Sequence, residues 1–373
     1  MTGVMMRLLD PFKRQRLKAV EDAMRDGDIL AALERFEQAA EAYAQAASIE
    51  PGNSTAHFKM GIAYAGMRRY GQATECFRNA VNLNSNDAVA LYNLGVALGE
   101  MGRYDEAILA LADAIRIDPD DAEAHCNLGV AYEATGQHEK AAREYELALR
   151  MGLVFANEVP NTHYRLGRVY CEIGCYDEAI ASLNQAVAIK PDFAEAHSQL
   201  AEAHMIMSSY EEGIEACKRA IAIRPDDSEA YYKLGVAYDN TGLYEEAIDA
   251  YKHLERLRPG DALAPYLLGG MYQGLARYED AITAWRRVIA MKPDDALAHT
   301  NLGLAYSGAG RFEEAIEACE MAVSLKPQLA GAQYYLGRIY AATGNRGGAI
   351  KQYEILLESN EELADRLLKA TDP

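Results

Sequence analysis

Histidine is the side chain used most often for acid–base catalysis near neutral pH, and this 373-residue chain contains eight. Five of them stand at one position of a repeating pattern, three residues before a Leu-Gly pair or its equivalent: His57, His125, His163, His197 and His299. A catalytic site needs side chains that converge, whereas side chains in phase with a repeat are typical of packing. The histidines therefore predict a structural role.

Acidic side chains recur in phase with the same pattern. The pairs Asp105-Glu106 and Glu245-Glu246 stand where the second helix of a repeat would begin, as do two further pairs. The helix dipole stabilises carboxylates in the first turn of a helix, which accounts for these pairs without paired-carboxylate catalysis.

Cys171 and Cys175 are four residues apart in the segment CEIGC. Gly174 is expected to end a helix between them, and no further Cys or His pair lies nearby in sequence, so a structural role is favoured over a metal or redox site. The chain has neither a glycine-rich phosphate loop nor a Gly-x-Ser-x-Gly elbow. The sequence therefore predicts a protein that is not an enzyme and has no cofactor and no metal.

Composition argues against several other classes of protein. A net charge of -19 repels phosphate backbones, so a nucleic-acid partner is not expected. No run of about 18 apolar residues is present, and the first residues lack the apolar core and cleavage site of a secretory signal. The six scattered cysteines fit a reducing compartment. These features predict a cytoplasmic protein whose membrane contact, if any, is peripheral.

A single spacing organises the chain. Successive repeats are 34 residues apart, except for one step of 38 residues. Nine repeats align on a glycine, and the remaining repeat has Ala201 in its place: Gly27, Gly61, Gly95, Gly129, Gly167, Gly235, Gly269, Gly303 and Gly337. A period in this range is the signature of a solenoid built from one supersecondary unit per repeat.

Each repeat is expected to form two helices. In residues 88–121, apolar side chains recur at helical spacing on both sides of the sequence MGRY. Gly102 should end the first helix in a left-handed conformation, and Pro119 should end the second. Gly95 lies in the middle of the first helix, where glycine costs about 1 kcal/mol relative to alanine. That cost is explained if two helices approach too closely there for a larger side chain.

The repeats resemble tetratricopeptide repeats. Residues 262–295, for example, carry Leu268-Gly269, Tyr272, Ala281, Trp285 and Pro293 at the diagnostic positions of that family. The resemblance spans roughly residues 20–363 and implies an all-α fold, a right-handed α-α superhelical solenoid. Repeats should then begin near residues 20, 54, 88, 122, 160, 194, 228, 262, 296 and 330.

Three segments lie outside the regular pattern. Residues 1–19 form a basic N-terminal segment, and residues 364–373 should finish a helix that caps the last repeat. Four additional residues fall within 152–159, where we expect a longer loop or a change in superhelical pitch. The basic segment could rest on an anionic membrane surface, dock a partner, fray, or fold onto the acidic surface of the chain itself.

The resemblance also implies where a partner would bind. In this family the first helix of each repeat lines a concave groove, with the second, fifth, sixth, ninth, twelfth and thirteenth residues of the repeat facing it. These positions carry aromatic, aliphatic, amide and cationic side chains here: Phe58, Tyr92, Asn93, Val96, Asn127, Val130, Tyr164, Arg165, Arg168, Met205, Tyr232, Lys233, Val236, Tyr266, Asn301 and Tyr334. Tyrosine often contributes strongly to binding at interfaces, and asparagine both donates and accepts hydrogen bonds. Tyr and Asn at these positions also serve packing in the family, so both interpretations stay open.

One specialised form of the family matches only in part. The carboxylate clamp that grips the acidic tails of chaperones needs a Lys and an Asn where this chain has Tyr92 and Val96, although Asn127 and Arg165 agree with it. A co-chaperone of that kind is therefore disfavoured.

The expected function is that of a non-catalytic scaffold or adaptor that binds an extended peptide or a helix of a partner protein in the groove. The alternative is a regulatory or assembly factor that docks to a membrane-associated complex through the basic N-terminal segment. Self-association through the end repeats is also open, because solenoids expose long surfaces.

Overall fold

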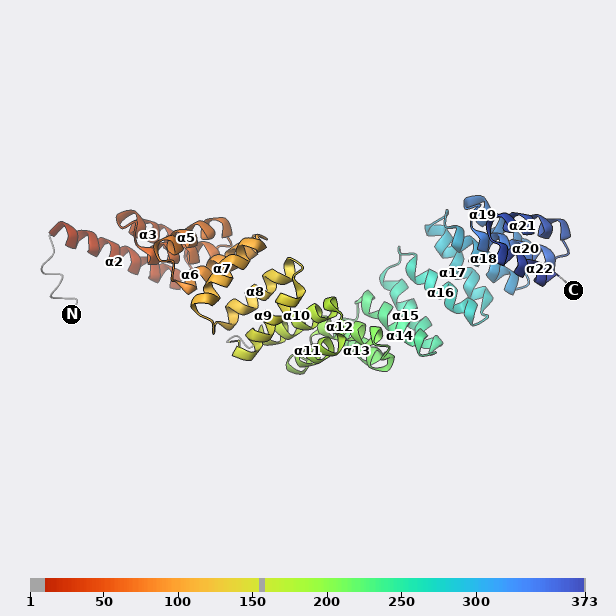
Figure 1. The fold of residues 1–373 in the computed structure, drawn as a ribbon, viewed down its shortest axis with the longest axis horizontal. Helices are drawn as coiled ribbons and strands as arrows, with labels where there is room; N and C mark the ends of the chain where they lie inside the picture. The colour runs from red at the N-terminus through yellow and green to blue at the C-terminus, as the bar shows by residue number, and fades with distance from the viewer. Residues whose placement is uncertain (1–10, 154–157, 372–373) are drawn as a thin grey trace. The chain divides into compact units, whose positions relative to one another are not determined.

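The computed structural model describes residues 11–153 and 158–371, and every regular element in these ranges is an α-helix (Figure 1). The chain divides into two compact units, residues 1–196 (unit 1) and 197–373 (unit 2). Each unit is a series of packed helix pairs, which confirms the expected all-α repeat fold.

Unit 1 contains five helix pairs: α2 (Pro11–Ala32) with α3 (Phe36–Ile49), α4 (Ser54–Gly66) with α5 (Tyr70–Leu83), α6 (Ala88–Glu100) with α7 (Tyr104–Ile117), α8 (Ala122–Ala134) with α9 (His138–Met151), and α10 (Glu158–Ile173) with α11 (Tyr176–Ile189). The second helix of each of the first four pairs also packs against the first helix of the next pair. Such nearest-neighbour packing defines a solenoid.

In unit 2 the pairs continue with the same packing. Helix α12 (Ala194–Ile206) spans the boundary between the units and precedes α13 (Tyr210–Ile223). The remaining elements are α14 (Ser228–Asn240) with α15 (Tyr244–Leu257), α16 (Leu263–Gly274) with α17 (Tyr278–Met291), α18 (Ala296–Gly308) with α19 (Phe312–Leu325), α20 (Ala330–Ala342) with α21 (Arg346–Ser359), and α22 (Glu361–Thr371). Helix α22 packs on α20 and α21, and its Leu367 is buried against Gly337.

The ends of the first helices follow from single residues. In α6, the Asp87 carboxylate accepts a hydrogen bond from the Ala90 amide at 3.0 Å, a cap that stabilises a helix by about 1 kcal/mol. The same helix ends before Gly102, whose φ is +71°. That left-handed residue confirms the prediction from the sequence, although Ser208 and Ala276 adopt the same conformation without being glycine.

The repeated glycine permits the two helices of a pair to approach closely. A Cβ atom at Gly129 would lie 2.7 Å from the Tyr145 ring, and one at Gly269 would lie 2.7 Å from the Trp285 ring. Both rings are fully buried. The close approach expected from the sequence is therefore present, and it places the largest core side chains directly under the groove helices.

The N-terminal segment is partly helical. Helix α2 begins at Pro11, so residues 11–19 continue directly into the first repeat, and residues 1–10 lie outside the described range. The Arg16 guanidinium donates to the Ile49 carbonyl at the end of α3, with Nε 2.9 Å from the oxygen. A cation at a helix C-terminus is stabilised by the helix dipole, so this arginine joins the first turns of α2 to the end of α3.

The inserted residues lie between α9 and α10. Gly152 follows α9 with φ +87°, and α10 begins at Glu158, two residues before Pro160. Part of the insertion therefore lengthens α10, because proline is compatible with the first turn of a helix. Of the apolar residues at this site, Leu153 is half-buried, and Val154 and Phe155 lie outside the described residues. Helix α10 still packs against both α9 and α11.

Within residues 11–153 and 158–371, no helix is both long enough and apolar enough to cross a bilayer.

Candidate functional site

The recurring histidines bond to the loop that precedes their own helix. The Nε2 atoms of His57, His125 and His299 lie 3.3, 3.2 and 3.0 Å from the carbonyl oxygen of the proline six residues earlier. Gln333 occupies the same position in its repeat, and its amide donates to the Pro327 carbonyl at 2.6 Å. These contacts support the packing interpretation, since each ties a first helix to the turn before it.

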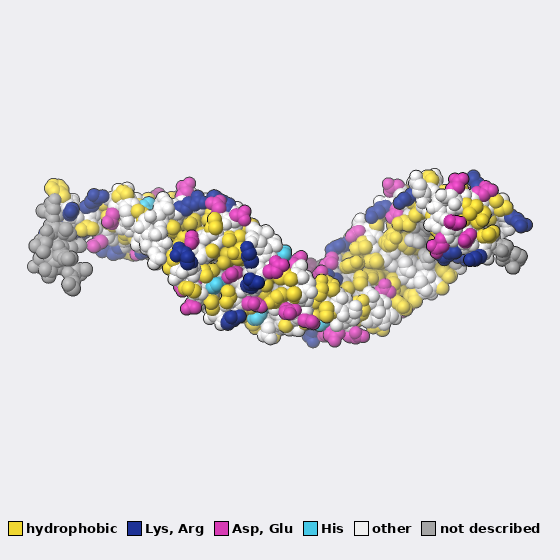
Figure 2. All heavy atoms as spheres, in the orientation of Figure 1, with side chains coloured by type: hydrophobic (Ala, Val, Ile, Leu, Met, Phe, Trp, Pro, Cys, Tyr) yellow, Lys and Arg dark blue, Asp and Glu magenta, His cyan; other side chains and the backbone are white. Residues whose placement is uncertain are grey.

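The acidic pairs lie in the first turns of second helices, as the sequence predicts. Some of them also pair with the next repeat: Arg277 lies 3.0 Å from Glu245, and Arg311 lies 3.3 Å from Glu279. On the face drawn in Figure 2, Lys and Arg side chains are accordingly interspersed with Asp and Glu. These exposed pairs each contribute little to stability.

The aromatic side chains at the fifth positions pack inward to different extents. The Phe58 ring lies 5.8 Å from Phe77, and the Tyr266 ring meets Trp285 edge-on at 4.9 Å between centroids. Tyr334 is only 8% exposed, whereas Tyr266 is 37% exposed. Packing therefore explains part of this pattern, and Tyr266 presents much more surface than Tyr334.

The other tyrosines predicted for the groove are half-buried. Tyr92 and Tyr232 pack against the hydrophobic cores of their units, and the Tyr164 ring lies 4.9 Å from Phe193. The aliphatic side chains between them are also half-buried: Val96, Val130 and Val236. Met205 lies beside Gly213 of α13.

Asparagine amides in the groove use their donors within the chain. The Nδ2 atoms of Asn93 and Asn127 donate to carbonyls four residues earlier in their own helices, at 2.8 and 2.9 Å. Asn127 Nδ2 also lies 3.2 Å from the Tyr92 hydroxyl. Asn127 therefore offers the groove its acceptor oxygen alone, whereas Asn93 uses one of its two N–H donors and can still both donate and accept, as the sequence predicts. Asn301 is half-buried.

Cations at the sixth positions pair with the preceding repeat. Lys233 Nζ lies 2.8 Å from a Glu202 carboxylate oxygen, and the Lys233 side chain is only 13% exposed. Lys59 makes the equivalent contact with Asp28 at 2.6 Å. These cations therefore join successive repeats.

In unit 1 the groove contains a polar pocket of about 390 Å³ between α8 and α10, here called the α8–α10 pocket. At its centre the Glu133 carboxylate accepts a hydrogen bond from the Tyr145 hydroxyl at 2.6 Å. Arg165 and Arg168 lie 3.4 and 3.6 Å from the same carboxylate, whose side chain is 14% exposed. Burial, reinforced by the Glu133 charge, raises the pKa of the Tyr145 phenol. Val130 adds an apolar wall.

In unit 2 the groove contains an aromatic and aliphatic pocket of about 440 Å³ between α14 and α16, the α14–α16 pocket. Tyr244, Tyr251, Tyr266, Leu267, Met271 and Leu275 supply its walls. Gly270 and Gly274 also line it, and Asp239 is its one acidic residue. Burial raises the pKa of the Tyr251 phenol, and the Asp239 charge adds to that effect.

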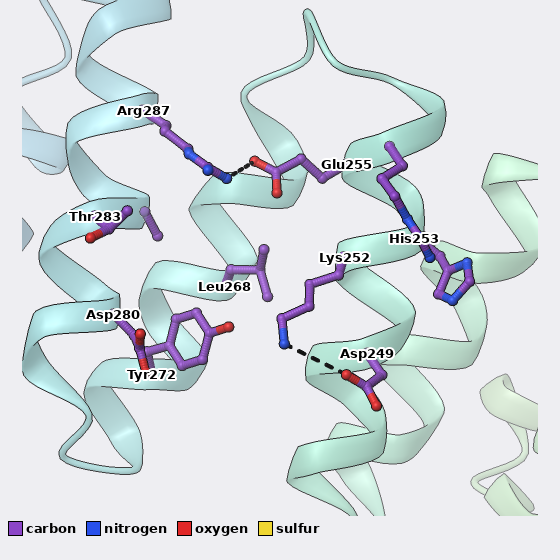
Figure 3. A pocket seen from close by; sticks show the side chains of 11 residues that line it. Asp249, Lys252, His253, Glu255, Leu268, Tyr272, Asp280, Thr283 and Arg287 are labelled. Carbon is purple, nitrogen blue, oxygen red and sulfur yellow. Dashed lines mark hydrogen bonds and ion pairs between the residues drawn. The ribbon is translucent and has the colours of Figure 1, made fainter.

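A third pocket, of about 650 Å³, lies between the second helices α15 and α17, on the side of the repeat away from the groove positions. Figure 3 shows Arg287 directed at Glu255 and Lys252 directed at Asp249, at 2.8 and 3.6 Å. Leu268 lies between the two pairs. These four charges are therefore paired within the wall of the pocket.

Glu133, Gly270 and Gly274 stand at the twelfth, ninth and thirteenth positions of their repeats, which the pattern places in the groove, but they were not among the predicted binding residues. A signal for Gly270 exists in the sequence LLGGMYQG, where a second glycine follows the one that packing requires. No comparable signal exists for Glu133, because its partners lie 12 and 32 or more residues away on other helices.

Models of the tetratricopeptide repeat match most of the chain. One matches residues 27–67, 100–136 and 167–208, and five others match residues 54–87, 76–109, 122–151, 192–259 and 266–330. The chain belongs to the tetratricopeptide repeat family. Repeats of this family are protein–protein interaction modules, and the architecture of this chain is that of an interaction scaffold.

Several solved structures resemble parts of this tetratricopeptide repeat chain. YrrB, described as a TPR protein with an unusual peptide-binding site, is 23% identical over 51% of this chain and 96% of its own, with a TM-score of 0.47. PilF of Pseudomonas aeruginosa is 19% identical over 58% and 96%, with a TM-score of 0.47. MamA of Desulfovibrio magneticus RS-1 is 27% identical over 45% and 96%, with a TM-score of 0.43. No curated protein matches the chain.

Proposed function

We propose that the chain is a non-catalytic adaptor of a reducing, cytoplasmic compartment that binds an extended peptide segment of a partner protein along the groove of its first helices. The observation that carries this proposal is the position of the α8–α10 and α14–α16 pockets. Both are lined mainly by fifth, sixth, ninth, twelfth and thirteenth residues of successive repeats, which are groove-facing positions. Concave sites with apolar walls and a few polar groups are typical of ligand binding.

Other side chains in the groove favour an extended peptide. Asn93 and Asn127 stand 34 residues apart, on consecutive first helices, and each offers an acceptor oxygen for the amide groups of a bound backbone. Val89, Leu263 and Leu297 occupy second positions and are 58%, 37% and 51% exposed. Burying such side chains under a partner is favourable, at about 25 cal/mol per Å² of apolar surface.

Selection of a random peptide library against the full chain tests this proposal. Selected peptides should lose binding at least tenfold when Tyr266→Ala removes the most exposed of these tyrosines, and Tyr92→Ala and Tyr232→Ala should weaken binding in their own regions. Leu109→Ala is the matched control, because Leu109 is 68% exposed on a second helix, α7. Circular dichroism checks that each variant is folded. Peptides insensitive to all three groove variants, or sensitive to Leu109→Ala, would place the binding site elsewhere.

A second candidate is docking to a membrane-associated complex through the start of α2. Phe12 is 81% exposed, and Lys13 and Lys18 of the same helix are exposed as well. An apolar ring among cations is suited to an anionic lipid surface. The full chain should then sediment with phosphatidylserine vesicles and not with phosphatidylcholine vesicles, and Phe12→Glu should abolish sedimentation. Equal behaviour with both vesicles removes this candidate.

A further inference from the structure

Gly270 has no packing reason to be glycine. A Cβ atom at the preceding Gly269 would collide with Trp285, whereas one at Gly270 would meet nothing within 4 Å. The same position carries Val236 in the preceding repeat and Leu304 in the next. Glycine is disfavoured inside a helix, so Gly270 weakens α16 without relieving a contact. Because glycine has no side chain, the backbone of α16 is uncovered beside Tyr266, and the α14–α16 pocket lies there.

The backbone at Gly274 is also uncovered, but for a different reason. In the next repeat the corresponding glycine, Gly308, lies directly against the ring of Tyr278. In unit 1 the corresponding Gly66 would place a Cβ atom 3.2 Å from the ring of Phe36. The residue that corresponds to these rings for Gly274 is Tyr244, yet nothing lies within 4 Å of a Cβ atom at Gly274. Tyr244 is 45% exposed and stands at the wall of the pocket.

The equivalent glycines in other repeats therefore show which kind of group packs against a glycine at this position. Where the glycine is covered, the group that covers it is an aromatic ring of the chain itself, Tyr278 or Phe36. Tyr266 and Tyr251 add ring surfaces to the pocket, and Met271 adds a polarisable sulfur. Aromatic pairs and sulfur–aromatic contacts both stabilise a ring in such surroundings. The chemistry of these walls matches one aromatic side chain of a partner.

The carboxylate at the pocket indicates which charge the partner should carry next to the aromatic residue. Asp239 is exposed and forms no ion pair within the described ranges, unlike Glu202 of the same unit, which pairs with Lys233. The net charge of the chain is -19. An unpaired carboxylate on a strongly acidic protein attracts cationic segments and repels acidic ones.

We infer that the α14–α16 pocket receives one aromatic side chain of a basic peptide segment, with the ring against Gly270 and Gly274 and a neighbouring Lys or Arg of the peptide paired with Asp239. This inference rests on the proposed function, since the pocket is part of the same groove. It adds to that proposal the chemical class of the bound segment, which is basic and carries an aromatic residue.

Four fluorescent nine-residue peptides test it with the full chain. They share flanking lysines and differ at one central residue, which is Trp, Tyr, Leu or Ala. Fluorescence anisotropy should show that the Trp and Tyr peptides bind about tenfold more tightly than the Ala peptide. Gly270→Leu, which fills the pocket with the side chain found in the next repeat, should reduce all four peptides to the Ala level. Asp239→Asn should weaken all four peptides about threefold and reduce the dependence of binding on salt.

Gly71→Leu is the matched control. Gly71 is an exposed helical glycine on the second helix α5, away from the groove positions, and a Cβ atom there also meets nothing within 4 Å. This variant should bind the four peptides as the unaltered chain does. Equal affinity for all four peptides, unchanged by Gly270→Leu, overturns the aromatic pocket but leaves groove binding intact. Failure of every peptide to bind also overturns the aromatic pocket, whereas the groove proposal stands or falls on the library selection.

Discussion

The two groove pockets are built on the same positions of the repeat and differ in whether their polar groups are paired. The twelfth residue of the first helix is a carboxylate in both, Glu133 in the α8–α10 pocket and Asp239 in the α14–α16 pocket. Glu133 is bound by a tyrosine hydroxyl and lies beside two guanidinium groups. Where the first pocket has Arg165 and Arg168, the second has Leu267 and Gly270. The second pocket therefore lacks the two cations that pair with the carboxylate of the first, and it also has Gly274 and Tyr244 where the first has Glu172 and His138.

This difference has an energetic consequence for binding. A ligand at the α8–α10 pocket must compete with hydrogen bonds and ion pairs that are already formed, and it must desolvate charged groups. A ligand at the α14–α16 pocket gains from covering apolar surface and meets one unpaired carboxylate. Unit 2 is therefore expected to provide most of the affinity for a peptide, and the polar cluster of unit 1 is expected to stabilise the fold.

The largest expected difference in stability is between alanine variants of the two adjacent glycines of α16, Gly269 and Gly270. Gly269→Ala should destabilise the protein by about 3 kcal/mol, because the new methyl group collides with the buried Trp285 ring. Gly270→Ala should instead stabilise it by about 1 kcal/mol, because alanine favours the helix and meets no neighbour. Urea unfolding followed by circular dichroism measures both. Destabilisation by Gly270→Ala would mean that this glycine has a packing role and that the pocket is not open.

The two carboxylates at the twelfth position provide a matched pair. Glu133→Ala should cost about 2 kcal/mol, because it leaves the buried Tyr145 hydroxyl and Arg165 without their partner, a loss moderated by the exposure of the arginines. Asp239→Ala should change stability by less than about 0.5 kcal/mol. Hydrogen exchange of α9 and α15 amides reports each change locally. Equal losses in the two variants would contradict the contrast between the pockets.

In unit 1, Tyr92 is expected to make stability depend on pH. Burial, with added repulsion from Asp121 and Glu123, raises its pKa to about 12, and Asn127 opposes the shift through a hydrogen bond. An unfolded tyrosine ionises near pH 10, so stability is complete below pH 10 and is lost as the pH rises toward 12. Tyr92→Phe should reduce this loss by about 1 kcal/mol after allowance for partial exposure.

Thermal unfolding of both proteins at pH 8 and pH 11 measures this effect. At pH 8 the difference between them isolates the lost hydrogen bond to Asn127, and the additional difference at pH 11 reports the ionisation. A loss of stability with pH that is as steep in Tyr92→Phe as in the unaltered chain would show that Tyr92 does not carry the shift.

The repeated features of the molecule were predictable, and the features confined to one repeat were not. The period, the paired helices, the buried glycines and the left-handed Gly102 follow from local sequence, because each depends on residues of one repeat. The pairing of Lys233 with Glu202 depends on which side chain the preceding repeat places opposite, and the pattern within one repeat does not contain that information. Gly269 is in phase with the repeat, so its packing against another helix was predictable, whereas the open surface at Gly270 depends on where the side chains around it lie. The start of α10 at Glu158 likewise depends on how the inserted residues fold.

Hydrogen–deuterium exchange of the full chain with and without the tightest peptide from the library tests the central claim most directly. Binding in the groove should slow exchange in α14 and α16, residues 228–240 and 263–274, and leave the outer helix α17, which supplies no residue to the α14–α16 pocket, unchanged. Protection confined to α15 and α17, or its absence from α14 and α16, would contradict the account.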